Sequence, residues 1–172
     1  MKVKKITIHP YFNPKSYAND IAIIKLQQNI RKYPKYVSEI PIVDFAKLQE
    51  QELKTNSSVK VYGWGKTHIN ETTSRFLIRA DLITWSDMDC RRDTHKTFLG
   101  IFKKRYPFPI ICASNPLTSV CLGDCGSPVV SADGKLAGIV IPSGNGCPLP
   151  GERNMFIKIS AYLNFIRSKI EI

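Results

Sequence analysis

Five cysteines carry the most reactive side chains of this 172-residue chain. They stand at positions 90, 112, 121, 125 and 147, with no Cys-x-x-Cys pair and no clustered histidines around them. Structural zinc sites use such pairs and clusters, so we expect no metal and no cofactor. Disulfide bonds are the better interpretation, and the odd number leaves one thiol unpaired.

Other features of the sequence favour an extracellular protein. Disulfides persist in oxidising compartments, and N-glycosylation sequons begin at Asn56 and Asn70. The stretch from Met1 to Pro10 does not have the pattern of a signal peptide. We therefore expect a secreted chain whose sequence is incomplete at its start.

The overall composition is that of a soluble globular protein. The chain is 43% hydrophobic and 23% charged, and its apolar runs are too short to span a bilayer. Its net charge of +11 favours acidic partners. The basic residues are spread in short clusters without a nucleic-acid motif, so we expect no nucleic-acid partner. An anionic glycan partner and a merely solvated basic surface both stay open.

Short β-branched runs alternate with turn residues and predict an antiparallel all-β fold. Asp133-Gly134, between two such runs, is a hairpin signal. A closing amphipathic helix is predicted over 161–170 with Ser160 as its cap, and 85–94 has helix-tolerant composition. The polar, proline-containing stretch 27–58 fits an interdomain connector. The predicted strands are Ile21–Leu26, Val59–Tyr62, Phe76–Leu82, Ile110–Cys112, Pro128–Val130, Leu136–Ile141 and Met155–Ile159.

The segment from Gly123 to Pro128 resembles the nucleophile loop of trypsin- and chymotrypsin-like serine proteases, Gly-Asp-Ser-Gly-Gly-Pro. Further segments similar to this family follow its order along the chain. The resemblance spans the whole chain but corresponds to about the last two-thirds of the family's domain. The segments are Asn19-Asp20-Ile21-Ala22, Gly63-Trp64-Gly65, Ile111-Cys112-Ala113, and Pro150-Gly151 followed by Met155 to Ser160.

This resemblance implies an all-β, trypsin-like double antiparallel β-barrel with a C-terminal helix. The first barrel would be incomplete and the second complete. A barrel that lacks strands exposes open edges and apolar faces, so we expect the isolated chain to be marginal or aggregation-prone. The implied parts are a first-barrel remnant at 1–27, a connector at 28–58, the second barrel at 59–160 and the helix at 161–172.

The resemblance also assigns catalytic positions. Asp20 would orient a histidine, Cys125 would stand in the nucleophile position, and the amides of Gly123 and Cys125 would form the oxyanion hole. The family's histidine precedes this aspartate by several dozen residues, whereas 19 residues precede Asp20 here. We interpret the three histidines of the chain as loop residues: His9, His68 and His95.

Two interpretations of Cys125 stay open. A thiolate is a good nucleophile, and cysteine proteases exist on this fold, so the cysteine alone does not end catalysis. The alternative is a degenerate position in an inactive homologue, which the altered surroundings favour. Ser127 replaces a family glycine, and Ile141-Pro142-Ser143 replaces Ser-Trp-Gly. The implied substrate-binding positions are Ser119, Ile141, Ser143 and Gly151, and Ser119 at the pocket floor disfavours Lys or Arg substrates.

Asp124 is linked by resemblance to activation, in which a freed N-terminal ammonium pairs with this aspartate. The chain has no Ile-Val-Gly-Gly start. Since an unpaired buried carboxylate is costly, we expect Asp124 to be protonated, paired with another cation, or exposed in a zymogen-like loop.

The family pattern implies the pairings Cys90–Cys112 and Cys121–Cys147, which leave Cys125 free. A further family disulfide would join positions 59 and 131, which here are Val59 and Ser131. Both of its cysteines are absent together.

Three functions remain as hypotheses. The first is a secreted, catalytically inactive protease homologue that binds a protein or peptide in its former substrate cleft. The second is a partial sequence of an active endopeptidase with a Cys nucleophile and a histidine encoded upstream. The third is a basic glycan-binding protein on the same scaffold.

Overall fold

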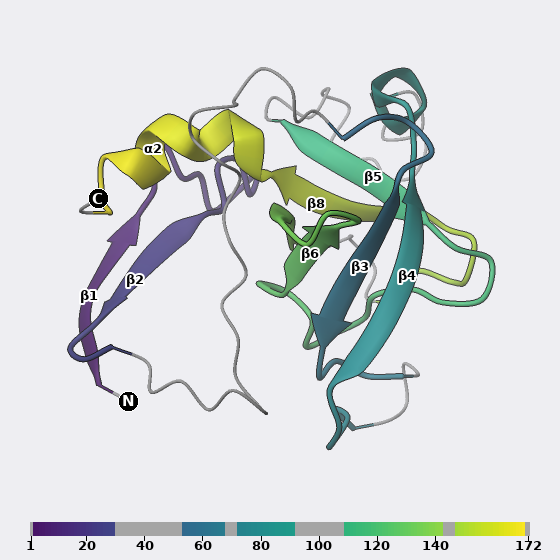
Figure 1. Cartoon of the computed structure of the whole chain (residues 1–172), viewed down its shortest axis with the longest axis horizontal. Helices are drawn as coiled ribbons and strands as arrows, with labels where there is room; N and C mark the ends of the chain where they lie inside the picture. Colours follow the sequence, from purple (N-terminus) through teal and green to yellow (C-terminus); the bar gives the residue numbers. More distant parts are fainter. Residues whose placement is uncertain (1, 30–52, 68–71, 92–108, 143–146, 171–172) are drawn as a thin grey trace.

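The computed structural model describes residues 2–29, 53–67, 72–91, 109–142 and 147–170. Figure 1 shows a barrel on one side of the molecule and a small two-stranded sheet on the other, with the C-terminal helix above the small sheet and reaching the barrel. Among the described residues, no helix is long and apolar enough to cross a membrane.

The barrel is closed by six antiparallel strands in the order β3-β4-β5-β8-β7-β6, with β6 paired back to β3. Val59 and Val61 alternate inward along β3 and pack with Leu82, Val129 and Phe156 in the barrel interior. The strands are β3 Ser58–Gly63, β4 Ile78–Thr84, β5 Ile110–Ser114, β6 Pro128–Ser131, β7 Leu136–Val140 and β8 Asn154–Lys158.

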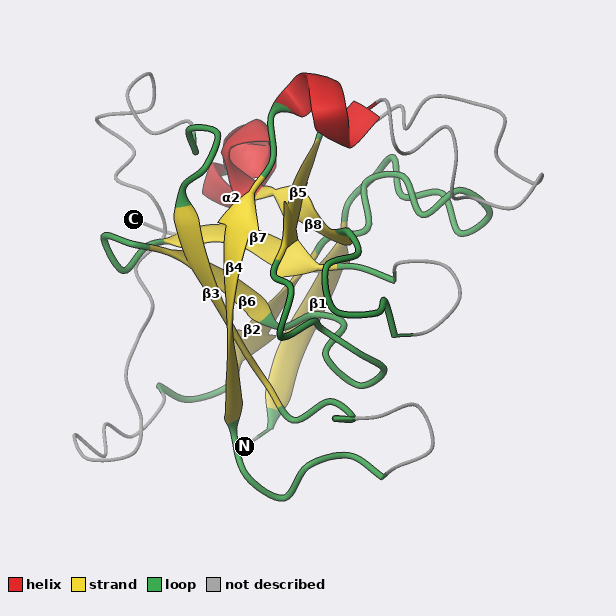
Figure 2. Cartoon of the chain, turned by 90° about the vertical axis from the view of Figure 1, so that its right-hand side faces the viewer, coloured by secondary structure: helices red, strands yellow, loops and turns green. Residues whose placement is uncertain are grey.

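A second apolar cluster lies between the barrel and the C-terminal helix. The chain leaves β8 through a 3₁₀ turn, Ile159–Tyr162, into helix α2, Leu163–Arg167. Met155 and Ile157 of β8 pack into this cluster, whereas Phe156 points to the barrel interior. Buried on both faces, β8 joins the two cores. Figure 2 shows α2 and the helical segment 87–91 at the same end of the barrel.

The small sheet pairs β1, Val3–Ile8, with β2, Ala22–Leu26, in antiparallel register. Ile21, just before β2, is buried in the cluster beneath α2, and Ile23 packs against it. This sheet contains two strands, against six in the closed barrel. The all-β fold with one complete barrel and a closing helix is thus confirmed.

The structure corrects several sequence predictions. Ser160 does not cap the helix, because the chain is already in the 3₁₀ turn at Ile159 and neither helical segment has a side-chain cap. The strand β1 was missed, since its lysines hide the apolar alternation. The strand predicted from Phe76 begins at Ile78. The hairpin is confirmed, with Gly134 in the left-handed region at φ 81° between β6 and β7. Most of the predicted connector 28–58 lies outside the described residues.

Candidate functional site

The loop that carries Cys125 is shaped by backbone hydrogen bonds and two left-handed glycines. The Asp124 N–H donates to the Cys121 carbonyl at 3.0 Å, and the Ser127 N–H donates to the Asp124 carbonyl at 2.9 Å. Gly123 and Gly126 have φ values of 96° and 87°, which other residues rarely adopt. The loop leads directly into β6 and presents Cys125 as an exposed free thiol.

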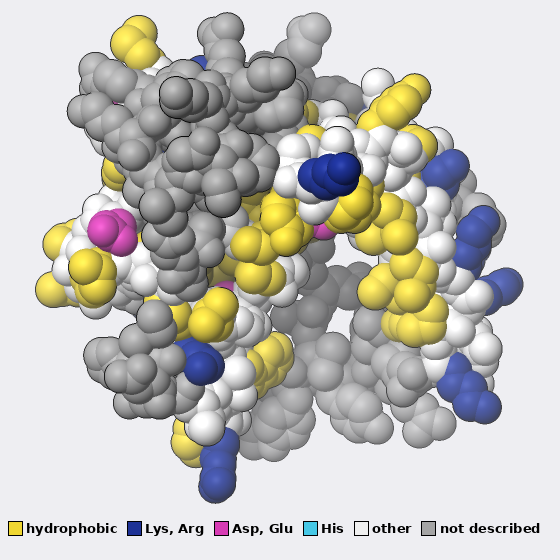
Figure 3. Space-filling view, turned by 180° about the vertical axis from the view of Figure 1, so that it is seen from behind, with side chains coloured by type: hydrophobic (Ala, Val, Ile, Leu, Met, Phe, Trp, Pro, Cys, Tyr) yellow, Lys and Arg dark blue, Asp and Glu magenta, His cyan; other side chains and the backbone are white. Residues whose placement is uncertain are grey.

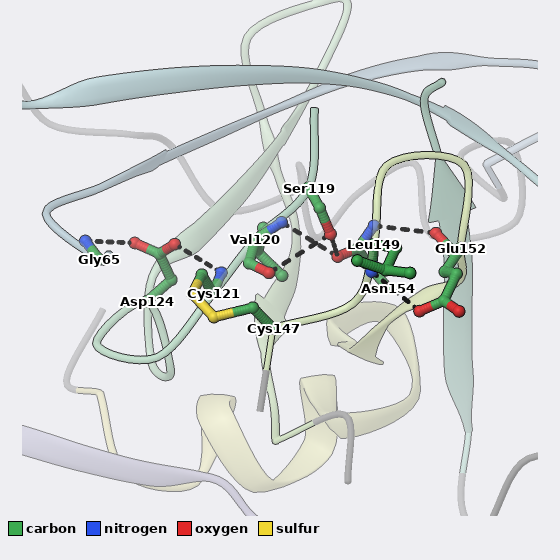
Figure 4. Close-up of a disulfide and its surroundings, with 9 residues drawn as sticks. All are labelled: Gly65, Ser119, Val120, Cys121, Asp124, Cys147, Leu149, Glu152 and Asn154. Carbon is green, nitrogen blue, oxygen red and sulfur yellow. Dashed lines mark hydrogen bonds between the residues drawn. A yellow bond between two sulfur atoms is a disulfide. The ribbon is translucent and has the colours of Figure 1, made fainter. Parts of the chain in front are cut away.

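Asp124 turns inward beneath this loop, as Figure 4 shows. Its carboxylate accepts one hydrogen bond from the Gly65 N–H at 2.8 Å and another from the Cys121 N–H at 3.0 Å. A Cβ atom at Gly63 or Gly65 would overlap this carboxylate. The expectation of a cation partner is therefore corrected, because backbone N–H groups donate to a partly buried Asp124 carboxylate.

The predicted oxyanion donor is Gly123. No described residue accepts a hydrogen bond from the Gly123 N–H. A Cβ at this position would lie 3.2 Å from the Gly65 Cα atom and 3.2 Å from the Thr73 Cγ2 atom. The close approach to Gly65 and the positive φ both require glycine here, and its role as an oxyanion donor stays a prediction.

Asp20 is positioned by a tightly bonded turn before β2. The Asn19 side chain donates to the Tyr11 carbonyl at 2.9 Å and accepts from the Tyr162 hydroxyl at 3.2 Å. The Ile21 N–H donates to the Asn19 carbonyl at 2.8 Å, and Asn19 itself has a φ of 56°. The closing helical segment thereby holds the turn that carries Asp20.

Asp20 and Cys125 share one electrostatic environment. Burial raises the pKa of the Asp20 carboxyl. Partial burial also raises the pKa of the Cys125 thiol above its ordinary range, and the negative charges of Asp124 and Asp20 raise it further against the opposing effect of the Cys125 backbone. The thiol is therefore protonated at neutral pH. Among the described residues, no donor hydrogen-bonds to the Asp20 carboxylate.

His9 is the single histidine of the described ranges, and it serves the packing of the small sheet. Its ring lies 4.7 Å from the Phe165 ring and 5.5 Å from the Tyr162 ring, centroid to centroid. Its Nδ1 atom accepts a hydrogen bond from the Tyr11 N–H at 3.2 Å, and burial lowers the pKa of the imidazole. His9 thus contacts the C-terminal helical segment, and no contact joins it to Cys125. His68 and His95 lie outside the described residues.

Ser119 lies on a buried polar network. Its hydroxyl donates to the Asn154 Oδ1 atom at 2.8 Å, and the Val120 N–H donates to the same atom at 3.0 Å. The Asn154 amide donates to the Ala113 carbonyl at 3.2 Å, and Asn154 is fully buried. Sequence reasoning missed Asn154, although a polar residue at the start of the apolar run to Ile157 is a signal.

Ser119 also borders a cavity of about 410 Å³, whose lining includes Asp124. Apolar side chains such as Val61, Leu117 and Leu149 line much of the cavity. Within the described ranges, no three His, Cys, Asp or Glu side chains gather as a metal site would require.

Comparison with known proteins places these features in one family. A family model described as Trypsin matches residues 1–166. The chain belongs to the trypsin family.

Individual members of the trypsin family show how much of a whole member the chain represents. It is 30% identical to duodenase-1 of Bos taurus over an alignment of 168 residues, with 96% of this chain and 60% of that protein covered. It is 23% identical to a trypsin of Saccharopolyspora erythraea, with 98% of this chain and 67% of that protein covered. The solved structure of neuropsin, a serine protease of mouse brain, superimposes with a TM-score of 0.79 at 25% identity, and covers 98% of this chain and 71% of that one. The chain thus spans about two-thirds of these relatives.

The two disulfides expected of a trypsin-family chain are present, Cys90–Cys112 and Cys121–Cys147. The positions of the missing third disulfide also lie together, because Val59 of β3 pairs directly with Ser131 of β6. This pairing explains why both cysteines can be absent together: neighbouring strand hydrogen bonds already join the two ends.

The other predicted substrate-binding positions and the predicted glycosylation sites lie in different environments. Ile141 is buried in the cluster beneath α2, and its N–H donates to the Met155 carbonyl at 3.3 Å. Gly151 is exposed with a φ of 89°, and its N–H donates to the Asn115 carbonyl at 2.7 Å. Asn56 is exposed in a turn before β3, at a φ of 60°. Ser143 and Asn70 lie outside the described residues.

Proposed function

We propose that this trypsin-family chain does not hydrolyse peptides by itself and acts by binding a peptide or protein ligand in its former substrate cleft. The observation that carries the proposal is the state of Cys125. A free thiol stands in the nucleophile position, and desolvation by neighbouring groups together with two carboxylates raises its pKa above the ordinary range of a cysteine.

Acyl transfer by a serine or cysteine nucleophile needs a base that takes the proton. Imidazolium beside a cysteine normally lowers the pKa of the thiol, whereas Asp124 and Asp20 act on Cys125 in the opposite direction. The Asp20 carboxylate has no hydrogen-bond donor among the described residues, so the acid that would orient a histidine is itself without a described partner. These features favour a binding protein over an enzyme.

The ligand that fits this cleft has an uncharged side chain at the position facing Ser119. The Ser119 hydroxyl is neutral and is already bonded to Asn154. A Lys or Arg side chain would find no carboxylate on Ser119 to offset its desolvation. Binding of such a ligand would require neither proton transfer nor nucleophilic attack by Asp20 or Cys125.

Secretion and N-glycosylation are part of the same proposal. The two disulfides support an oxidising compartment, since cytosolic proteins rarely keep such bonds. Asn56, exposed in a turn, is accessible to glycosylation, and a shift in mass after treatment with a glycosidase would test the modification.

A cleavage assay tests the proposal. The chain is incubated with a pool of fluorogenic peptides that covers neutral, acidic and basic residues at the cleavage position. We expect the same background turnover for the chain and its Cys125→Ala variant, together with measurable binding of peptides that carry an uncharged residue. Turnover that Cys125→Ala abolishes would overturn it and favour an endopeptidase. Repeating the assay with any longer natural form of the protein tests whether a histidine outside this sequence restores hydrolysis.

A further inference from the structure

Asn154 is a fully buried polar residue whose side chain makes four hydrogen bonds. Its Oδ1 atom accepts from the Ser119 hydroxyl at 2.8 Å and from the Val120 N–H at 3.0 Å. Its Nδ2 atom donates to the carbonyl oxygens of Ala113 at 3.2 Å and Glu152 at 3.4 Å. An asparagine amide has two donor hydrogens and an oxygen with two lone pairs, so the whole capacity of this side chain is used inside the protein.

The barrel fixes the position of this side chain. Asn154 is the first residue of β8, and its backbone lies opposite Ala113 of β5. Ser119 and Val120 lie outside the strands. The Asn154 amide therefore connects an irregular segment to a rigid strand, and the Val120 N–H depends on a side chain for its acceptor.

The segment that Asn154 holds leads directly into the Cys125 loop. The Cys121 N–H follows the Val120 N–H along the chain and donates to the Asp124 carboxylate at 3.0 Å (Figure 4). Two consecutive backbone amides are thus held by two different side chains, Asn154 from the barrel and Asp124 from the loop itself. Loss of the Asn154 amide would free the chain where it enters the loop.

We propose that Asn154 is a positioning residue that holds the Cys125 loop in one shape, and thereby sets both the reactivity of the Cys125 thiol and the affinity of the cleft for its ligand. Asn154 is buried and acts through Ser119 and Val120. A loop that is already ordered loses less entropy when a ligand binds. The effect on ligand affinity rests on the proposed function, whereas the effect on the thiol does not.

The pH profile of Cys125 alkylation by iodoacetamide tests the proposal in the variant Asn154→Ala. Burial is the largest cause that raises the pKa of this thiol, and a released loop admits more water. We expect the midpoint of the profile to fall by about 0.5 pH units, which makes alkylation at pH 8 about threefold faster.

Thr84→Ala is the matched control, because it removes the hydrogen bonds of another buried side chain. The Thr84 hydroxyl donates to the Lys54 carbonyl at 2.8 Å and accepts from the Ser57 N–H at 2.9 Å, so it serves the turn before β3. This variant should lose stability and keep the alkylation midpoint. Equal shifts in the two variants, or no shift in Asn154→Ala, would overturn the proposal.

Hydrogen exchange of the unchanged chain keeps the test decisive if circular dichroism shows that Asn154→Ala does not fold. The Val120 amide should exchange at least about 100-fold more slowly than an unprotected amide, because the buried Asn154 oxygen accepts its hydrogen. Exchange of this amide at the unprotected rate would overturn the proposal.

Fluorescence polarisation measures the affinity for peptides that carry an uncharged residue. Figure 3 shows Lys and Arg side chains along the edge of the molecule, so peptides of one net charge are compared. Asn154→Ala should weaken binding at least about fivefold, and Thr84→Ala should not. Equal affinities of the two variants would overturn the effect on the ligand. If no peptide binds the unchanged chain, the proposed function fails, and the alkylation profiles still decide the role of Asn154.

Discussion

The Asp124 carboxylate lies directly against Gly65, whose backbone N–H donates to it at 2.8 Å. This contact ties the loop that presents Cys125 to the end of β3. A second hydrogen bond, from the Cys121 N–H at 3.0 Å, closes the same loop on itself. The loop therefore has a defined shape that does not require a cation beside Asp124.

Gly65→Ala should destabilise the fold, because the new Cβ would overlap the Asp124 carboxylate. We expect a loss of about 1–3 kcal/mol, as for overpacking elsewhere. Urea denaturation of Gly65→Ala, Asp124→Ala and the double variant measures it. The loss in the double variant should be smaller than the sum of the single losses, since Asp124→Ala removes the overlapping atoms. Additive losses would show that the two residues do not interact.

Alkylation of Cys125 by iodoacetamide should reach its half-maximal rate at a higher pH than alkylation of free cysteine, because the thiolate is the reactive form and the pKa of the thiol is raised. Asp20→Asn removes one of the charges that raise this pKa, so the midpoint should move to lower pH. Asp81→Asn, at an exposed carboxylate paired with Arg79, is the control and should leave the midpoint in place. A midpoint near neutral pH would instead indicate a nearby cation.

Asp20→Asn should also change the pH dependence of stability. The folded-state pKa of Asp20 is raised above its ordinary value of 3.8, so the folded state binds the proton more tightly than the unfolded state. The stability from this group is present below pH 3.8 and is lost as the pH rises through the raised pKa. In thermal melts, the stability of the Asp20→Asn variant should not show this loss with rising pH, because Asn does not titrate. The variant should therefore gain stability relative to the unchanged protein between low and neutral pH. A less stable Asn variant at neutral pH would reveal a bonded partner of the carboxylate.

Asn154→Ala should cost more than Ser119→Ala. The first change removes the acceptor of both the Ser119 hydroxyl and the Val120 N–H, and the Val120 amide is then left without a partner in a buried site. We expect a loss of about 1–3 kcal/mol for each buried group left unsatisfied. Ser119→Ala leaves Asn154 bonded to Val120 and should cost less. Chemical denaturation of both variants gives the comparison, and equal losses would contradict it.

Sequence patterns predicted the features that depend on local residue type. The hairpin at Asp133-Gly134 follows from turn chemistry, and the alternation in β3 follows from its buried valines. The strand β1 could not be predicted in the same way. Its lysines interrupt the apolar pattern, and its extended form depends on pairing with β2, which follows ten or more residues later.

The interactions of the candidate site residues could not be predicted from the sequence. The resemblance gave the places of Asp20, Gly123 and Cys125 along the chain. The hydrogen-bond donors to Asp124 are backbone N–H groups. Every residue except proline carries such a group, so the residue types in the sequence do not predict which ones bind Asp124. The hydrogen bond between Ser119 and Asn154 joins residues 35 positions apart. It depends on the position of β8 in the barrel, which a local sequence pattern does not predict.

The hydrogen bond from the Tyr162 hydroxyl to Asn19 spans 143 positions of the sequence. A ribosome makes the small sheet early and the helical segment that secures it much later. Until Tyr162 and Phe165 leave the ribosomal exit tunnel, His9 and Ile21 lack the side chains against which they pack in the folded protein. The apolar side chains of the nascent β1 and β2 segments therefore stay exposed until the C-terminal segment is synthesised. Such exposed apolar segments are the substrates of chaperones that bind unfolded chains.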